Sequence, residues 1–346
     1  MIAPGEPTKY IDNEHPALRV CYHPVCRSTD LLDGQVLAVR LLGEHWALAR
    51  IDGRPIALAD RCAHRGMPLS AGCVVDGTVE CPYHGYRYGV DGRCTLIPAL
   101  GPGSPIPPRA RVGAAFDVVE RYGLVWLAPD EPVTGVIDVP EWDDPAFVVA
   151  SLPDQEWPAG AGQMTENFLD MGHLPFLHAK TFGDPEGIEV PPYTVERDGW
   201  TFVCDLRHTA KVLADSHGNG DVYRIDERRS TWWYAAPFAL RLRLEYADGV
   251  VLTILFFHQP VDARTTKLYA FDLRNDIADG RTTVEDAVAF QLAVGAEDQT
   301  MLAHLRDGAT PLDLQAEVHT RADRNTVEMR RVLADLVAHT GVASDE

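Results

Sequence analysis

The sequence has few basic residues, no long apolar segment and no leader-like N-terminus. Its 346 residues include 31 Lys and Arg against 51 Asp and Glu, a formal net charge of −20. Nucleic acids and anionic membranes attract basic surfaces, so this balance argues against both as the main partner. No apolar run approaches the roughly 18 residues that span a membrane. The polar first ten residues lack the apolar core of a signal peptide, and we therefore expect a cytoplasmic protein.

Nucleotide-binding glycines and cysteines are also scarce. No Gly-x-Gly-x-x-Gly run follows a predicted strand, so the chain carries no flavin or nicotinamide fingerprint. Electrons for any redox reaction must therefore come from a separate protein. Five of the seven cysteines are Cys21, Cys26, Cys73, Cys94 and Cys204, and we expect them to be reduced and mostly buried thiols.

The other two cysteines belong to two short motifs that also contain histidine. The motifs read Cys62-x-His64 and Cys81-x-x-His84, with sixteen residues between them. Two thiolates and two imidazoles are the ligands of a Rieske [2Fe–2S] cluster, in which two histidines replace two cysteines on one iron. The same residue types permit a Cys2His2 zinc site, although a single-residue Cys-x-His spacing is unusual for zinc.

A second group of metal-ligating residue types lies near the middle of the chain. Asn167, Asp170 and His173 recur every three residues, so a helix would place them on one face. We expect Pro175 to disrupt this helix and to let His178 approach the same metal as His173. Two histidines and a carboxylate form the facial triad of non-haem Fe(II) oxygenases. Two ordinary core histidines are the alternative.

The carboxylate of such a triad must come from elsewhere in the chain. Residues 283–305 show the periodicity of an amphipathic helix, and Asp298 interrupts its apolar stripe. A buried carboxylate needs a partner charge, which a metal ion would supply. We therefore select Asp298 and expect Glu297, one position further round, to face away. His304 and Asp286 are weaker candidates.

Short apolar runs between turn residues predict a small antiparallel β domain over residues 35–128. The proline- and acid-rich segment Pro129 to Pro145 has no periodicity and marks a domain boundary. We expect one domain over residues 1–135 and another over residues 136–346. Strand-like runs in the second domain are Trp200–Leu206, Ser230–Tyr234, Leu240–Tyr246, Val250–His258 and Thr266–Leu273.

Together, these motifs make the chain resemble the Rieske non-haem iron oxygenases, and in particular the vanillate O-demethylase branch. The resemblance implies an α+β protein with an N-terminal all-β Rieske domain and a C-terminal catalytic domain of helix-grip fold. It implies a [2Fe–2S] cluster bound by the two Cys/His motifs and a mononuclear iron bound by His173, His178 and Asp298. It also implies a homotrimer in which Asp170 bridges His173 to His84 of the adjacent chain, with Asn167 adjusting the iron site.

The function implied by this resemblance is that of a terminal oxygenase. It would use O2 and electrons from a separate NAD(P)H-dependent reductase, directly or through a ferredoxin, to hydroxylate or demethylate a small aromatic or cyclic compound. Apolar sheet residues such as Phe238, Leu242, Ile254 and Phe256 would line the substrate pocket. Alternatives are an aromatic-ring cis-dihydroxylating α-subunit, an electron carrier, which needs only the first 130 residues or so, and a zinc-stabilised binding protein.

Overall fold

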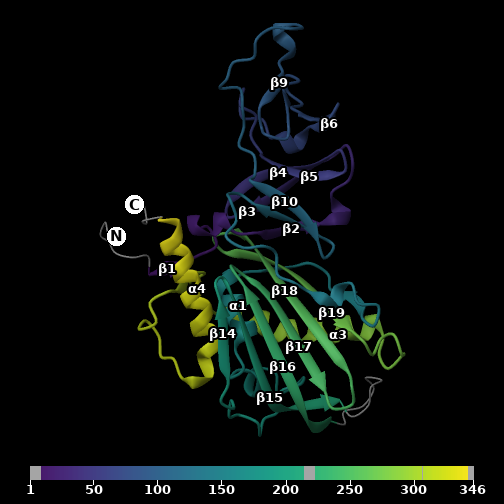
Figure 1. The fold of residues 1–346 in the computed structure, drawn as a ribbon, viewed down its shortest axis with the longest axis vertical. Helices are drawn as coiled ribbons and strands as arrows, with labels where there is room; N and C mark the ends of the chain where they lie inside the picture. The colour runs from purple at the N-terminus through teal and green to yellow at the C-terminus, as the bar shows by residue number, and fades with distance from the viewer. Residues whose placement is uncertain (1–8, 214–222, 306, 342–346) are drawn as a thin grey trace. The chain divides into compact units, whose positions relative to one another are not determined.

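The computed structural model describes residues 9–213, 223–305 and 307–341, and it divides into two compact units (Figure 1). One unit comprises Leu18–Gly135 with Pro260–Asp262, and is built from strands. The other comprises Val136–Gln259 and the chain from Ala263 onward, together with the segment that ends at Ala17. It combines a large sheet with helices, so the α+β prediction is confirmed.

The first unit contains three small antiparallel sheets. The sheets contain, in order, β10 (Asp117–Arg121), β11 (Leu124–Ala128) and β2 (His23–Arg27); β3 (Val36–Leu41), β4 (Glu44–Ile51) and β5 (Arg54–Ala59); and β6 (Cys73–Val75), β7 (Thr78–Glu80), β8 (Arg87–Tyr88) and β9 (Cys94–Leu96). Cys62 follows β5, and Cys81 follows β7. Both thiols belong to a buried cluster with side chains of these strands, such as Leu58 and Val79. The core of this unit therefore lies directly beneath the two ligand loops.

The second unit is organised around one antiparallel sheet of eight strands. The order is β12 (Val148–Ser151), β19 (Thr265–Arg274), β18 (Val251–Asp262), β17 (Ala239–Tyr246), β16 (Tyr223–Ala235), β15 (Thr201–Leu213) and β14 (Thr194–Asp198), and β13 (Gln155–Trp157) also pairs with β19. A short pair joins β1 (Tyr10–Ile11) to β20 (Thr310–Pro311). All five strands expected between residues 200 and 273 are present.

The described part of this second unit contains four α-helices: α1 (Ala161–Leu169), α2 (Leu174–Leu177), α3 (Val284–Leu302) and α4 (Arg324–Thr340). The helix expected over residues 283–305 is α3, and the Thr283 hydroxyl caps it by accepting the N–H of Asp286. Helix α4 packs against β14 and β15. It buries the side chains of a regular apolar stripe, namely Met329, Val332, Leu333, Leu336 and Val337. No helix among the described residues is long and apolar enough to cross a membrane.

The expected helix through Asn167, Asp170 and His173 is wrong. Helix α1 ends at Leu169, and Asp170 is extended with ψ 135°. The Asp170 carboxylate accepts the backbone N–H groups of Gly172 at 2.8 Å and His173 at 3.1 Å, and thus satisfies N–H groups that a continued helix would use. Pro175 lies in the first turn of α2, where proline is tolerated, and does not cause the break.

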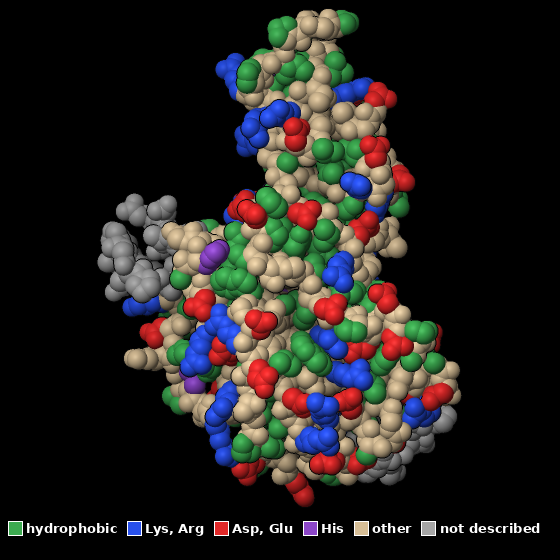
Figure 2. Space-filling model, viewed as in Figure 1, with side chains coloured by type: hydrophobic (Ala, Val, Ile, Leu, Met, Phe, Trp, Pro, Cys, Tyr) green, Lys and Arg blue, Asp and Glu red, His purple; other side chains and the backbone are tan. Residues whose placement is uncertain are grey.

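The surface over the large sheet carries charges of both signs. Figure 2 shows acidic and basic side chains interspersed on this face, without a continuous area of either sign. Arg229 of β16, for example, forms ion pairs with Asp205 on β15 and Glu245 on β17. Arg243 pairs with Glu245 on the same strand. This pattern differs from the basic stripe of a nucleic-acid-binding surface.

Candidate metal centres

The two Cys/His motifs form a pair of similar loops. In the first loop, the N–H of Gly66 donates to the carbonyl oxygen of Cys62 at 2.9 Å, and in the second the N–H of Gly85 donates to that of Cys81 at 3.0 Å. Both glycines have positive φ values, +72° and +66°, a conformation that glycine adopts without strain. Each loop therefore turns tightly enough to present a cysteine and a histidine together.

The four side chains of these loops fit a cluster with one sulfur-ligated and one nitrogen-ligated iron. Cys62 and Cys81 are buried, whereas His64 and His84 are exposed. The Nδ1 atoms of the two histidines face each other at 3.2 Å, so both rings direct the same nitrogen toward one point. Partial desolvation, followed by the charges of His84 and Arg65, lowers the pKa of His64 and favours the neutral imidazole that ligates metals.

Tyr88 contributes a hydroxyl that the sequence did not point out. Its Oη lies 3.1 Å from the Sγ of Cys62 and also accepts the backbone N–H of Ala63 at 3.1 Å. Burial, with a further contribution from Cys62, raises the pKa of Tyr88, so the phenol stays protonated and can donate to a metal-bound thiolate of Cys62. Hydrogen bonds to cluster sulfurs tune the reduction potential.

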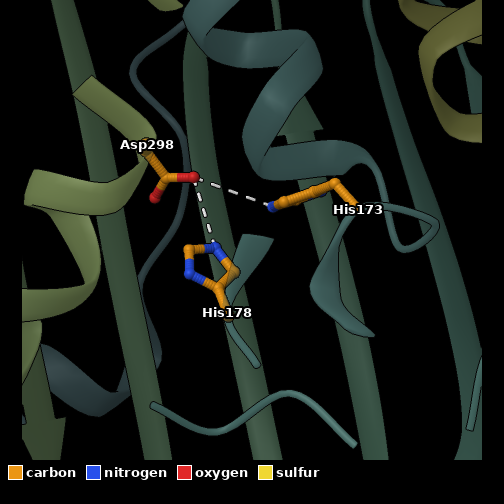
Figure 3. Close-up of side chains that lie close together, drawn as sticks. All are labelled: His173, His178 and Asp298. Atoms are coloured by element: carbon orange, nitrogen blue, oxygen red, sulfur yellow. Dashed lines mark ion pairs between the residues drawn. The ribbon is translucent and has the colours of Figure 1, made fainter. Parts of the chain in front are cut away.

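The second candidate centre brings together His173, His178 and Asp298 (Figure 3). Oδ1 of Asp298 lies 3.2 Å from Nε2 of His178 and 3.8 Å from Nε2 of His173. Asp298 comes from α3, and the two histidines flank α2. One ligand atom from each residue lies within 4.8 Å of the others, which suits nitrogen and oxygen ligands of a single metal ion.

A carboxylate holds the other ring nitrogen of each histidine. Nδ1 of His173 lies 3.1 Å from Oδ2 of Asp170, and Nδ1 of His178 lies 2.8 Å from Oε2 of Glu297. Glu297 also accepts the hydroxyl of Thr181 at 3.0 Å. With Nδ1–H donated to these carboxylates, both Nε2 atoms are left as acceptors for a metal, an arrangement common among metal-binding histidines.

The pKa shifts at this centre concern Asp170 and His178. Burial alone would raise the pKa of Asp170, but hydrogen bonds from His173 and Gly172 lower it. For His178, burial acts to lower the pKa, and the hydrogen bonds and charges of Asp298 and Glu297 raise it above the usual value. A bound divalent cation would replace the additional proton of His178 and balance the buried negative charge of the carboxylates.

Asn167 holds the buried carboxylate of Asp298, a candidate metal ligand. It lies in α1 with 8% of its surface exposed, and its Nδ2 donates to Oδ1 of Asp298 at 2.8 Å. Asp298 itself is 2% exposed. The structure therefore places Asn167 beside the proposed metal ligands, where it orients a ligand oxygen.

Two sequence-based expectations about α3 have different outcomes. Glu297 does not face away, because its carboxylate reaches His178; the expectation that it would was wrong. The weaker candidates stay outside the centre. His304 is exposed with its Nδ1 near the carbonyl oxygen of Thr300, and Asp286 accepts the hydroxyl of Thr283.

A cavity of about 500 Å³ adjoins this centre, and the three candidate ligands line it. Most of its wall is apolar, and Phe168 stacks on Phe256 with ring centroids 4.1 Å apart. Of the four pocket residues suggested by the sequence, Leu242, Ile254 and Phe256 line the cavity, whereas Phe238 is buried elsewhere. Its aromatic lining consists of Trp157, Phe168, Phe182, Trp232, Tyr246, Phe256 and Phe290.

Comparisons with known proteins agree with both centres. Residues 21–120 match the family described as the Rieske [2Fe-2S] domain, and residues 157–339 match the vanillate O-demethylase oxygenase C-terminal domain. The chain is 32% identical over 337 residues to methylxanthine N1-demethylase of Pseudomonas putida, covering 94% of this chain and 91% of the relative. It is 30% identical to the methylxanthine N3-demethylase of the same species, covering 91% and 88%.

A solved structure of the N1-demethylase with caffeine superimposes with a TM-score of 0.82 and 29% identity, covering 95% of this chain and 94% of that one. These relatives are demethylases, so the alternative of a ring-dihydroxylating subunit is not favoured. Enzymes of this type are oxygenase components that require O2 and a reductase. The chain therefore belongs to the Rieske non-haem iron oxygenases, as a terminal component of monooxygenase and demethylase type that carries a [2Fe–2S] cluster and a mononuclear iron.

Proposed function

We propose that this oxygenase removes a methyl group from nitrogen or oxygen of a small, flat ring compound. The observation that carries the proposal is the cavity of about 500 Å³ beside His173, His178 and Asp298, with its aromatic wall. This volume suits a small organic molecule, and aromatic walls favour planar rings. The N-demethylase activity of the relatives supports a methyl group on a heteroatom.

The proposed reaction inserts one oxygen atom of O2 into a methyl C–H bond. Two electrons and two protons reduce the other oxygen atom to water. The resulting N–CH2OH or O–CH2OH group then loses formaldehyde and leaves N–H or O–H. When bound, the cluster supplies single electrons and the mononuclear iron supplies the reaction with O2.

The chain's own residues hold and orient these groups. We propose Cys62, His64, Cys81 and His84 as ligands of the cluster, the histidines through Nδ1. His173 and His178 would bind the mononuclear iron through Nε2, and Asp298 through its carboxylate, as the contacts in Figure 3 indicate. Asp170 fixes the tautomer of His173, and Glu297 fixes that of His178. The Asn167 amide restrains the Asp298 carboxylate.

Asp170 is the proposed link between the two kinds of centre. Its carboxylate already holds Nδ1 of His173 at 3.1 Å, and its side chain is 29% exposed, so one part of it can meet another residue. We propose that this residue is His84 of an adjacent subunit in a homotrimer. A mass measurement in solution would test the trimer, because each chain has a mass of 38.1 kDa.

We propose an NAD(P)H-dependent reductase as the electron donor, directly or through a ferredoxin, and a cytoplasmic location. Cell fractionation would test the location.

Reconstitution with a surrogate reductase tests the enzymatic proposal. Purified protein should contain acid-labile sulfide and three irons per chain, and it should release one formaldehyde for each O2 consumed with its methylated ring substrate. Formation of a cis-diol, or hydroxylation without release of formaldehyde across a broad panel of methylated rings, would contradict demethylation.

A further inference from the structure

Arg228 is a buried cation in the wall of the catalytic cavity. It lies in β16, lines the cavity and is 7% exposed. Its guanidinium carbon lies 5.9 Å from the ring centroid of Phe182, and that ring in turn stacks on His178 with centroids 4.9 Å apart. One aromatic ring therefore separates Arg228 from a proposed iron ligand.

Among the residues that the structure describes, little compensates the charge of Arg228. A guanidinium has five N–H donors. Among the described residues, one of these has a hydrogen-bond partner: Nε donates to Nε2 of His208 at 3.3 Å, and no carboxylate lies within ion-pair distance. Burial of an ion without a partner is unfavourable. The four donors of the terminal nitrogens are thus available to a ligand in the cavity.

His208 contributes a hydrogen bond but no negative charge. Burial, and then the charge of Arg228, lowers the pKa of His208 to about 4, so the ring is neutral. Its Nδ1–H donates to the carbonyl oxygen of Thr209 at 3.0 Å, which leaves Nε2 as the acceptor that Arg228 and Ser230 share. His208 therefore orients the guanidinium without neutralising it.

The acidic residues of the cavity have other partners. Asp276 is held by Arg274 through two hydrogen bonds of 2.9 and 2.8 Å, and Asp286 is bonded to Thr283 at the start of α3. Asp298 and Asp170 belong to the metal centre. Asp248 accepts the N–H of Val250 in the turn after β17. The carboxylates of the cavity lining therefore do not neutralise Arg228, and a negatively charged ligand could do so.

We infer that Arg228 binds an anionic group of the substrate, a carboxylate or a sulfonate. Its planar guanidinium donates parallel N–H bonds that match two oxygens of such a group, and these charge-assisted bonds are stronger inside a desolvated cavity. The inference rests on the proposed function and deepens it, because it assigns a charge to the methylated ring compound. A neutral compound in the same position would leave the cation uncompensated.

Matched pairs of anionic and neutral ligands test this assignment in the holoprotein. The probes are 4-methoxybenzoate against 4-methoxybenzamide, and 4-methoxybenzenesulfonate against its sulfonamide. Quenching of Trp157 and Trp232, which line the cavity, reports binding, and calorimetry checks it. We expect one anion or both to bind at least about tenfold more tightly than the neutral partner, the size of a charge-assisted contact. The two pairs distinguish the carboxylate from the sulfonate.

Variants assign this preference to one residue. Arg228→Gln should reduce the anion preference to less than about threefold, and Arg228→Lys should keep part of it. Arg229→Gln is the matched control, because Arg229 is the next residue in β16 and pairs on the surface with Asp205. It removes the same charge and should keep the preference. If Arg228→Gln does not fold, the lysine variant and the unmodified protein decide.

The assignment is overturned if neither anion binds more tightly than its neutral partner in the unmodified protein, including the case in which no probe binds. It is equally overturned if Arg228→Gln keeps the full preference. Release of formaldehyde is measured separately. Arg228-dependent anion binding without formaldehyde from any methylated ring leaves this inference intact and counts against demethylation. Release of formaldehyde from a neutral methylated ring, without any preference for anions, would support demethylation and overturn the assignment of Arg228.

Discussion

Glu297 holds His178 from the side opposite to Asp298. Oε2 of Glu297 lies 2.8 Å from Nδ1 of His178, while Oδ1 of Asp298 lies 3.2 Å from Nε2 of the same ring. Two consecutive residues of α3 therefore contact the two nitrogens of one imidazole. One carboxylate is placed to bind the metal, and the other fixes the direction in which the histidine faces it.

Replacement of Glu297 by alanine should weaken iron binding without unfolding the protein. Loss of the acceptor at Nδ1 leaves the His178 tautomer undetermined, and removal of such orienting partners typically lowers metal affinity about 10- to 100-fold. Iron retained during dialysis against a chelator measures the effect. Glu297→Gln keeps an acceptor oxygen and should be milder. Glu285→Ala, an exposed position on the same helix, is the control; equal loss of iron in both alanine variants would refute the orienting role.

The Asp170→Asn variant tests the proposed link between centres. Asp170 contacts Nδ1 of His173 and leaves Nε2 of that ring free for the metal, so the variant should retain both metals. Because the proposed link between the centres is broken, it should turn over at a small fraction of the normal rate. Sulfide and iron content report the metals, and stopped-flow oxidation of the reduced cluster reports electron transfer. Normal reoxidation with substrate and O2 present would eliminate the bridge assignment.

Spacing in the sequence predicts candidate ligands that are local to one loop or one helix. The cluster motifs lie in two short loops, and Asp298 lies in the expected helix, which the structure confirms as α3. The break after Leu169 escaped notice because a three-residue repeat also suits a helix. After Leu169 the Asp170 carboxylate accepts backbone N–H groups that a helix would otherwise use. These hydrogen bonds depend on the local backbone conformation, about which the spacing of residue types says nothing.

The residues that sequence reasoning missed contact residues that are far away in the sequence. Glu297 reaches His178 over 119 positions of sequence, and Tyr88 reaches Cys62 over 26. Arg228 occupies a strand position next to another arginine, and such a pair reads as a solvated surface. Only the pairing of β15 with β16, which sets His208 opposite Arg228, reveals which arginine is buried. Long-range contacts of this kind require the register of the sheet.

Tyr88→Phe should lower the reduction potential of the cluster. The phenol hydroxyl lies 3.1 Å from Sγ of Cys62, and a donor to sulfur stabilises the reduced, more negative state. A hydrogen bond worth about 1 kcal/mol corresponds to roughly 40 mV for a one-electron couple. Redox titration followed by EPR measures the shift. Tyr86→Phe keeps the ring stacked on His64 and serves as control; an unchanged potential in the Tyr88 variant would deny the donor role.

Asp272 should make the protein less stable as pH rises. It is completely buried on β19, and this burial raises its pKa to about 7, although the Arg274 charge opposes the rise. Between about pH 4 and 7 the folded state holds a proton that the unfolded state releases, so the free energy of unfolding falls with pH across this window. Above pH 7 the destabilisation is complete, and a pKa raised from about 4 to about 7 corresponds to up to about 4 kcal/mol.

Asp272→Asn removes this titration. The variant should lose the decline between about pH 4 and 7, and above pH 7 it should be more stable than the unmodified protein, because a neutral amide replaces a buried carboxylate. Urea unfolding at a series of pH values measures the free energy of unfolding. Asp144→Asn, at an exposed position of the same unit, should follow the unmodified profile. A decline that persists in the Asp272 variant would mean that another group titrates in this range.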